Sequence, residues 1–131
     1  MRILFIGDIF GKPGREAARK AIPALIERDA IDFVIANVEN SAAGFGVTGD
    51  LADTILSYGV DVMTSGNHVW DKKEVLEYLP RQPRLLRPAN FPAGVPGRGT
   101  FVGRTRTGEP IAVVNLMGRI FMNPLDDPFA A

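Results

Sequence analysis

The side chains with the greatest chemical potential in this chain fall in three short segments, Gly7-Asp8, Glu39-Asn40 and Gly66-Asn67-His68. His68 is the single histidine among 131 residues. Carboxylate and amide oxygens with one imidazole suit divalent cations such as Mn, Fe, Mg or Zn, and a glutamate can bridge two such ions. The residue types therefore indicate metal-site chemistry.

Each of these segments follows a short apolar run, with at most one residue between them, and the three runs span residues 2–6, 33–38 and 61–64. The runs are rich in Ile, Val and Phe without clean alternation, which is typical of parallel strands buried on both faces. Ligand-binding loops of parallel α/β sheets gather at the carboxyl ends of the strands. We therefore expect the three segments to meet at one edge of a sheet.

Taken singly, each segment also has an ordinary structural explanation. An aspartate after a strand, such as Asp8, often only caps the next helix, and Glu39-Asn40 is a common loop pair. A lone histidine beside Trp70 is more often a partly buried structural residue than a catalyst. The coincidence at three consecutive strand ends is what favours a functional site.

Helical patterns separate the apolar runs, at residues 13–29 and 48–59, with Thr48 as N-cap and Gly59 as C-cap of the second. A third helix is predicted over residues 71–79, with Asp71 as its N-cap. The alternation of strands and helices is typical of a layered α/β fold, a doubly wound parallel sheet with helices on both faces.

The second part of the chain predicts fewer regular elements. A long loop rich in Pro and Gly follows Leu79, interrupted at most by a short strand near Leu85-Leu86. Residues 100–104 and 111–116 then predict a hairpin that turns at residues 107–109. The length suits one domain, and with no internal repeat or low-complexity tract we expect residues 1–131 to belong to a single domain.

Composition excludes several classes of protein. Fifteen basic and fifteen acidic residues leave a formal net charge of zero, which argues against long nucleic acid or an anionic membrane as partner. The chain has no cysteine, so disulfides, thiolate metal sites and cysteine nucleophiles are excluded. The run Ile3–Ile6 is too short for a membrane span or signal-peptide core, and we expect a soluble, cytoplasmic protein.

Two glycine-rich stretches imitate nucleotide-binding motifs. Gly44, Gly46 and Gly49 match the dinucleotide fingerprint, but they follow the strand after a gap and no acidic residue stands at the expected later strand end. The stretch from Gly7 to Pro13 imitates a P-loop, yet its glycines are one residue too close and proline replaces the Ser or Thr. The sequence therefore predicts neither a dinucleotide-binding site nor a P-loop.

The combined motifs resemble those of a known superfamily, the calcineurin-like metallophosphoesterases. The resemblance is closest to the YmdB-type bacterial phosphodiesterases, which act on cyclic nucleotides, and it covers essentially the whole chain. It rests on Gly7-Asp8-x-x-Gly11, Asn37-Val38-Glu39-Asn40, Ser65-Gly66-Asn67-His68-Val69-Trp70-Asp71 and Leu86-Arg87-Pro88-Ala89-Asn90.

The resemblance implies a role for each of the five candidate residues. Asp8 and Asn40 would hold one metal ion, Glu39 would bridge two, and Asn67 would bind the second. His68 would be the proton donor to the leaving oxygen rather than a ligand. The cofactors implied are two metal ions, Fe or Mn first and Mg or Zn as alternatives, acting on a small phosphodiester substrate in a protein expected to be a homo-oligomer.

The resemblance also implies that something is missing from this chain. Members of the family are roughly twice as long and supply three further metal-binding histidines from the second half of the fold, so residues 1–131 correspond to the N-terminal half. The polypeptide is then a fragment, or partner chains complete the site. We expect weak metal occupancy and little activity from this chain alone.

Two other functions remain open at this point. The chain could be a non-catalytic α/β module that binds a nucleotide or a partner protein through the same sheet edge. It could also be a different phosphatase or nuclease of the superfamily. Metal-dependent hydrolysis of a phosphodiester separates the enzyme from the binding module, and no substrate-binding residue is assigned.

Overall fold

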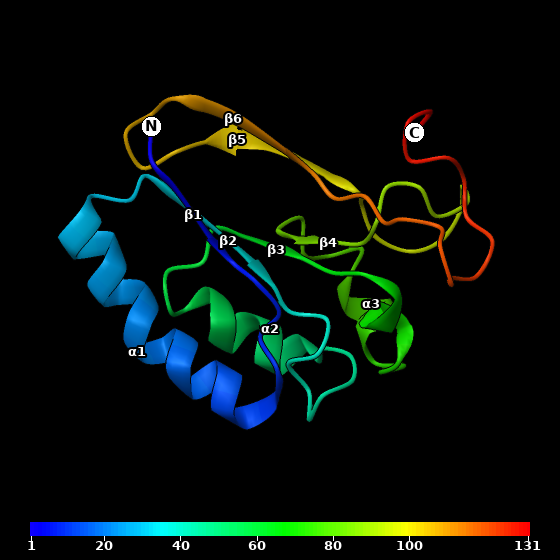
Figure 1. Ribbon diagram of the computed structural model, residues 1–131, viewed down its shortest axis with the longest axis horizontal. Coiled ribbons are helices and arrows are strands. Elements are labelled where there is room, and N and C mark those ends of the chain that lie inside the picture. The colour runs from blue at the N-terminus through cyan, green and yellow to red at the C-terminus, as the bar shows by residue number, and fades with distance from the viewer.

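Four parallel strands form the sheet that carries the predicted site. The computed structural model describes residues 1–131 (Figure 1). The strands follow the chain order across the sheet and are β1 (Ile3–Ile6), β2 (Phe33–Asn37), β3 (Val62–Thr64) and β4 (Leu85–Leu86). Each pair of neighbours is parallel, so all four carboxyl ends lie at the same edge. The strands expected from the apolar runs are therefore confirmed.

The helices pack on one face of this sheet and bury the larger core. They are α1 (Gly11–Asp29), α2 (Gly49–Leu56), the 3₁₀ turn η1 (Asn67–Trp70) and α3 (Val75–Tyr78). Ile22 of α1 and Ile55 of α2 lie fully buried in one cluster with Val34, Ala36 and Met63 of the strands. Figure 1 shows α1 and α2 side by side below the sheet.

A hairpin covers part of the other face. Strands β5 (Thr100–Arg104) and β6 (Pro110–Val114) pair antiparallel, as the sequence predicted. Alternate residues of β6 are buried, and Ile111 and Val113 pack against Phe33, Val62 and Leu86 of the parallel sheet. The chain thus consists of a layer of helices, a parallel sheet and a two-stranded sheet, which Figure 1 shows from bottom to top.

The α/β class with a parallel sheet is confirmed, but the expectation of helices on both faces differs from what these residues form. The strand order β1-β2-β3-β4 never reverses direction. Because crossovers between parallel strands are right-handed, successive steps in one direction place every connecting helix on the same face. The second face is therefore left for β5 and β6.

The helix ends differ in part from the sequence prediction. Thr48 caps α2 as expected, since its Oγ1 accepts a hydrogen bond from the backbone N of Leu51 at 3.2 Å. Gly59 is not the C-cap, which is Ser57, but lies in the following turn with φ of +101°. The helix predicted over residues 71–79 is wrong at its start, because the Asp71 carboxylate contacts His68 instead of capping a helix.

None of the helices combines the length and the apolar character needed to cross a lipid bilayer.

Candidate active site

The loops after β1 and β2 are joined at the sheet edge by backbone and side-chain hydrogen bonds. The Nδ2 of Asn40 donates to Oδ2 of Asp8 at 2.8 Å. The backbone N of Ile9 donates to the Asn37 carbonyl at 3.0 Å, and that of Gly11 to the Asn40 carbonyl at 2.9 Å. The parallel pairing of β1 and β2 thus brings together two residues that are 32 positions apart in the sequence.

Three hydrogen bonds hold Glu39, one from its backbone N and two to its carboxylate oxygens. Asn37 makes two of them, accepting from the Glu39 backbone N at 3.2 Å and donating from Nδ2 to Oε1 at 3.3 Å. The other oxygen, Oε2, accepts the backbone N–H of His68 at 3.2 Å. Glu39 therefore links the loop after β2 to the loop after β3.

Gly66 makes this close approach possible. A Cβ atom at this position would lie 2.6 Å from Oε2 and 2.7 Å from Oε1 of Glu39, far inside van der Waals contact. Any other residue at position 66 would push the carboxylate away. The glycine before Asn67 and His68 is thus required by the position of Glu39 rather than by its own backbone angles, since φ is −135°.

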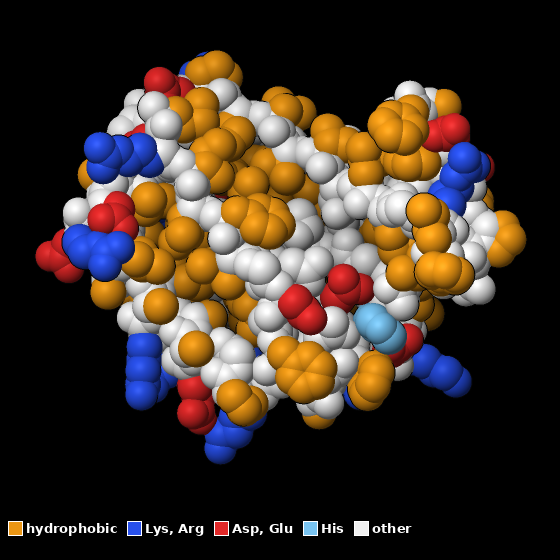
Figure 2. Space-filling model, in the orientation of Figure 1, with side chains coloured by type: hydrophobic (Ala, Val, Ile, Leu, Met, Phe, Trp, Pro, Cys, Tyr) orange, Lys and Arg blue, Asp and Glu red, His pale blue; other side chains and the backbone are white.

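His68 is partly exposed and its ring is fixed by two neighbours. Its Nδ1 lies 2.7 Å from Oδ2 of Asp71. The ring of Phe45 meets it edge to face, with centroids 5.4 Å apart. Figure 2 shows the histidine beside acidic side chains on one face of the molecule, with hydrophobic side chains at the same edge.

The polar atoms at this edge fit a hard cation. The Oδ1 of Asn40 is buried yet has no hydrogen-bond partner, and a carbonyl oxygen in that state is stabilised by a donor or a positive ion. The carboxylates of Asp8 and Glu39 supply negative charge nearby. No group of three or more His, Cys, Asp or Glu side chains is placed to hold a metal ion, so a cation at this edge would need amide oxygens as well as carboxylates.

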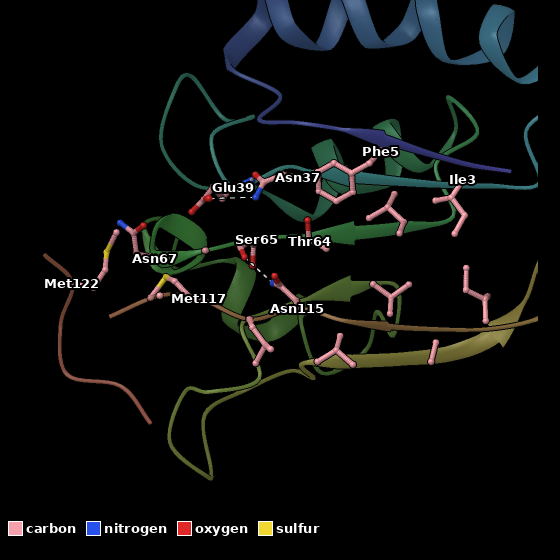
Figure 3. Close-up of a pocket in the computed structure, with 18 residues that line it drawn as sticks. Ile3, Phe5, Asn37, Glu39, Thr64, Ser65, Asn67, Asn115, Met117 and Met122 are labelled. Carbon is pink, nitrogen blue, oxygen red and sulfur yellow. Dashed lines mark hydrogen bonds between the residues drawn. The ribbon is translucent and has the colours of Figure 1, made fainter. Parts of the chain in front are cut away.

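Asn67 is exposed and lies across the edge from Glu39. Both residues stand at one end of a groove of about 770 Å³ between the parallel sheet and the hairpin. Figure 3 shows their side chains on the same side of the groove opening, with Ile3 and Phe5 further along it. The structure therefore brings all five candidate residues to one edge, Asp8 with Asn40 and Glu39 with the Asn67-His68 turn.

Two supporting residues, Asn37 and Asn115, received no role in the sequence analysis. Asn37 stands at the end of β2, where its polar side chain in an apolar run was the available signal. Asn115, directly after β6, donates from Nδ2 to the carbonyls of Ser65 at 2.7 Å and Leu86 at 3.1 Å. It ties the end of the hairpin to the ends of β3 and β4, a long-range contact that no local pattern predicts.

The family is decided by comparison with known proteins. The family model described as YmdB-like protein matches residues 4–131. This chain belongs to the YmdB-like family. The resemblance drawn from the sequence motifs is thereby confirmed.

Relatives in the YmdB-like family are about twice as long as this chain. A Bacillus subtilis (strain 168) protein named 2',3'-cyclic-nucleotide 2'-phosphodiesterase is 48% identical over 130 residues, which are 98% of this chain and 48% of that protein. The chain thus spans about half the length of the curated relatives it matches.

Solved structures of two relatives share the fold. A hypothetical protein from Thermus thermophilus has a TM-score of 0.90 and 45% identity, over 99% of this chain and 50% of that one. A Mycoplasma pneumoniae protein described as a novel phosphatase has a TM-score of 0.88 and 29% identity, over 98% of this chain and 47% of that one. The α/β fold of this YmdB-like chain therefore matches about half of each longer relative.

Proposed function

We propose that this chain is the N-terminal part of a single metallophosphoesterase domain that hydrolyses cyclic nucleotides, 2',3'- and 3',5'-cyclic phosphodiesters being the candidate substrates. The observation that carries the proposal is the pair of contacts that joins three loops, Asn40 to Asp8 and Glu39 to the His68 backbone. The printed name of the B. subtilis relative supports a phosphodiester substrate.

Four residues would hold the metal ions. Asp8 and Asn40 are assigned to one ion, Glu39 to both and Asn67 to the second, and Fe or Mn suits this set with Mg or Zn as alternatives. Bound divalent ions would supply an activated water and stabilise negative charge on the phosphoryl oxygens. The unpartnered Oδ1 of Asn40 is the atom in this structure that most directly supports such an ion.

His68 would transfer the proton that the reaction needs. Hydrolysis forms one P–O bond from water and breaks the P–O bond to an alkoxide of the sugar, which is too basic to leave without a proton. A carboxylate only accepts hydrogen bonds, so Asp71 holds the proton of Nδ1 and leaves Nε2 as the atom that donates to the leaving oxygen.

A second polypeptide segment would complete the domain by covering the groove. The groove is open and apolar on the side of β1, where Ile3 is 50% and Phe5 is 59% exposed. β1 is an edge strand with one unpaired side. An exposed apolar surface next to an open sheet edge is expected to be buried by further chain, and the double length of the relatives supports this.

The test joins this chain to the second half of the B. subtilis relative and measures Mn²⁺-dependent hydrolysis of 2',3'-cyclic AMP. We expect activity from the chimera and little from residues 1–131 alone. Asp8→Ala should lose bound metal and activity, whereas Glu16→Gln should keep both, because Glu16 is an exposed carboxylate that pairs only with Lys12 at 3.8 Å.

A metal titration of residues 1–131 provides a readout that does not depend on the chimera. Weak Mn²⁺ binding that Asp8→Ala removes and Glu16→Gln retains supports the proposed ligands. Metal-loaded chimera without hydrolysis of any cyclic nucleotide would favour the non-catalytic binding module instead.

A further inference from the structure

An exposed aromatic ring stands beside His68 with no structural role in the core. The ring of Phe45 is 59% exposed, and Phe45 belongs to neither buried cluster of the fold. Its centroid lies 5.4 Å from that of the His68 imidazole, with 66° between the two planes. With more than half of its surface exposed, Phe45 remains accessible to another planar group.

The loop that carries Phe45 is closed and held by its own backbone. The Ala42 N donates to the Gly46 carbonyl at 2.9 Å, and the Gly44 N donates to the Asn40 carbonyl at 3.1 Å. Gly44 and Gly46 have φ of +97° and +78°, angles that favour glycine. The loop therefore presents Phe45 in a defined place, with a glycine on either side of it.

Neighbouring residues enclose the same two glycines. A Cβ atom on Gly44 would lie 2.8 Å from Cζ of Phe10, and one on Gly46 would lie 3.2 Å from the backbone N of Lys72. The loop is thus packed between the start of α1 and the segment after η1. This loop begins at Asn40, a proposed metal ligand, so the position of the Phe45 ring is coupled to that of the proposed metal site.

We propose that Phe45 is the surface on which the base of a nucleotide substrate stacks. This inference rests on the proposed function. The leaving oxygen of a cyclic nucleotide belongs to the ribose, and the base is attached to that same ribose. If His68 donates its proton to the leaving oxygen, the base must lie one sugar ring away from the imidazole, and Phe45 is the exposed aromatic ring in contact with it.

Stacking also determines the expected specificity. Every base has an aromatic face, so a single phenyl platform accepts all bases and favours purines by their larger area. Removing an aromatic platform weakens single-base stacking by about tenfold in affinity, within the range known for such contacts. The Phe45 platform therefore predicts broad base tolerance rather than recognition of one nucleobase.

The rival role for Phe45 is to steady His68. A ligand without a base separates the two roles, because a steadying residue affects both kinds of ligand equally. The experiment uses residues 1–131 with Mg²⁺ and measures dissociation constants by NMR titration of adenosine 2',3'-cyclic monophosphate and of ribose 2',3'-cyclic phosphate, which lacks the base. Phe129→Ala is the matched control, since Phe129 is 99% exposed elsewhere on the chain.

For the wild type we expect the nucleotide to bind about tenfold more tightly than the base-free ligand. Phe45→Ala should remove that difference and leave the base-free ligand unaffected, Phe45→Trp should restore it, and Phe129→Ala should change neither constant. Equal weakening of both ligands, or no weakening, would overturn the base platform while leaving the proposed function intact. Absence of Mg²⁺-dependent binding of either ligand to residues 1–131 would also overturn the base platform, whereas the proposed function is tested separately by hydrolysis in the chimera.

Discussion

The imidazole Nδ1 of His68 lies 2.7 Å from Oδ2 of Asp71, three residues later in the chain. The contact spans the end of η1, whose last turn brings position 68 and position 71 to the same side. A carboxylate in this place fixes the orientation of the imidazole ring. Asp71 is thereby a positioning residue for the proposed proton donor.

Replacing Asp71 by Asn should lower turnover without loss of metal. In the metal-loaded chimera we expect kcat to fall by about one to two orders of magnitude for Asp71→Asn and by about two to four for His68→Ala, the range of general acid catalysis. Bound metal, measured by elemental analysis, should stay at the wild-type level in both variants.

Glu74→Gln is the control for Asp71→Asn, because Glu74 is an exposed acidic residue in the same segment and the carboxylate bound to the His68 ring is that of Asp71. It should leave kcat unchanged. Loss of metal in His68→Ala equal to its loss of activity would identify His68 as a ligand instead of a proton donor.

Gly66→Ala should weaken metal binding while leaving the fold intact. The added Cβ would meet both oxygens of Glu39 within 2.7 Å and displace the carboxylate from its place between Asn37 and His68. The proposed bridging ligand would then be misplaced. Isothermal titration with Mn²⁺ should show at least about a tenfold weaker affinity, the effect expected when groups that orient a ligand are disturbed.

Gly7→Ala is the matched control for Gly66→Ala. Gly7 follows β1 as Gly66 follows β3, yet a Cβ at Gly7 would have nothing within 4 Å. It should bind metal like the wild type. Equal weakening in both variants would mean that the effect comes from general backbone stiffening, and it would contradict the specific role of Gly66.

The sheet and the edge of the site could be predicted from sequence because they follow from local patterns. Apolar runs identify β1 to β3, and parallel pairing carries the residue after each strand to one edge, whatever the details of packing. Asp8, Glu39 and His68 therefore had to approach one another. The N-cap at Thr48 was predictable for the same reason, since it needs only one side chain and the next turn.

The remaining contacts depend on tertiary packing that no local pattern encodes. Asp71 carries a helix-capping signal, and its bond to His68 overrides that signal. The second face of the sheet is covered by β5 and β6 because the strand order never reverses, which only the pairing shows. Asn115 reaches Ser65 across 50 residues, so its role too emerges only in the fold.

Thr48→Ala should destabilise the chain by about 1 kcal/mol. The variant removes the hydroxyl that satisfies the Leu51 backbone N–H at the start of α2. Thr54→Ala is the control, because Thr54 lies within α2 and its hydroxyl only donates back to the Asp50 carbonyl. Urea unfolding should show a lower midpoint for Thr48→Ala and a change within about 0.5 kcal/mol for Thr54→Ala.

Stability should decline in alkaline solution through Tyr78. Burial, followed by the hydrogen bond from its hydroxyl to Asp53, raises the pKa of Tyr78 to about 12 from 10.0. The folded state keeps its proton where the unfolded state has lost it, so this stabilisation is complete below pH 10 and is lost as pH rises toward 12. The Tyr78→Phe variant cannot ionise at this position, so its unfolding free energy, measured with urea, should fall less than that of the wild type between pH 10 and 12. An equal fall of the unfolding free energy with pH in both proteins would contradict the role of Tyr78.

Phe5→Asp tests whether the second segment buries the groove, and it should destabilise the chimera much more than residues 1–131 alone. Phe5 is already 59% exposed on the groove side of β1, so a charge there should change the unfolding free energy of residues 1–131 by less than about 1 kcal/mol. In the chimera the same carboxylate would be buried between the two halves without a partner, at a cost of several kcal/mol, and the thermal midpoint should drop well below that of the parent. Val102→Asp provides the comparison, because Val102 is 81% exposed on β5 and does not line the groove. If both variants lower the thermal midpoint of the chimera equally, the groove is not the surface that the second segment covers, because of these two residues only Phe5 lines the groove.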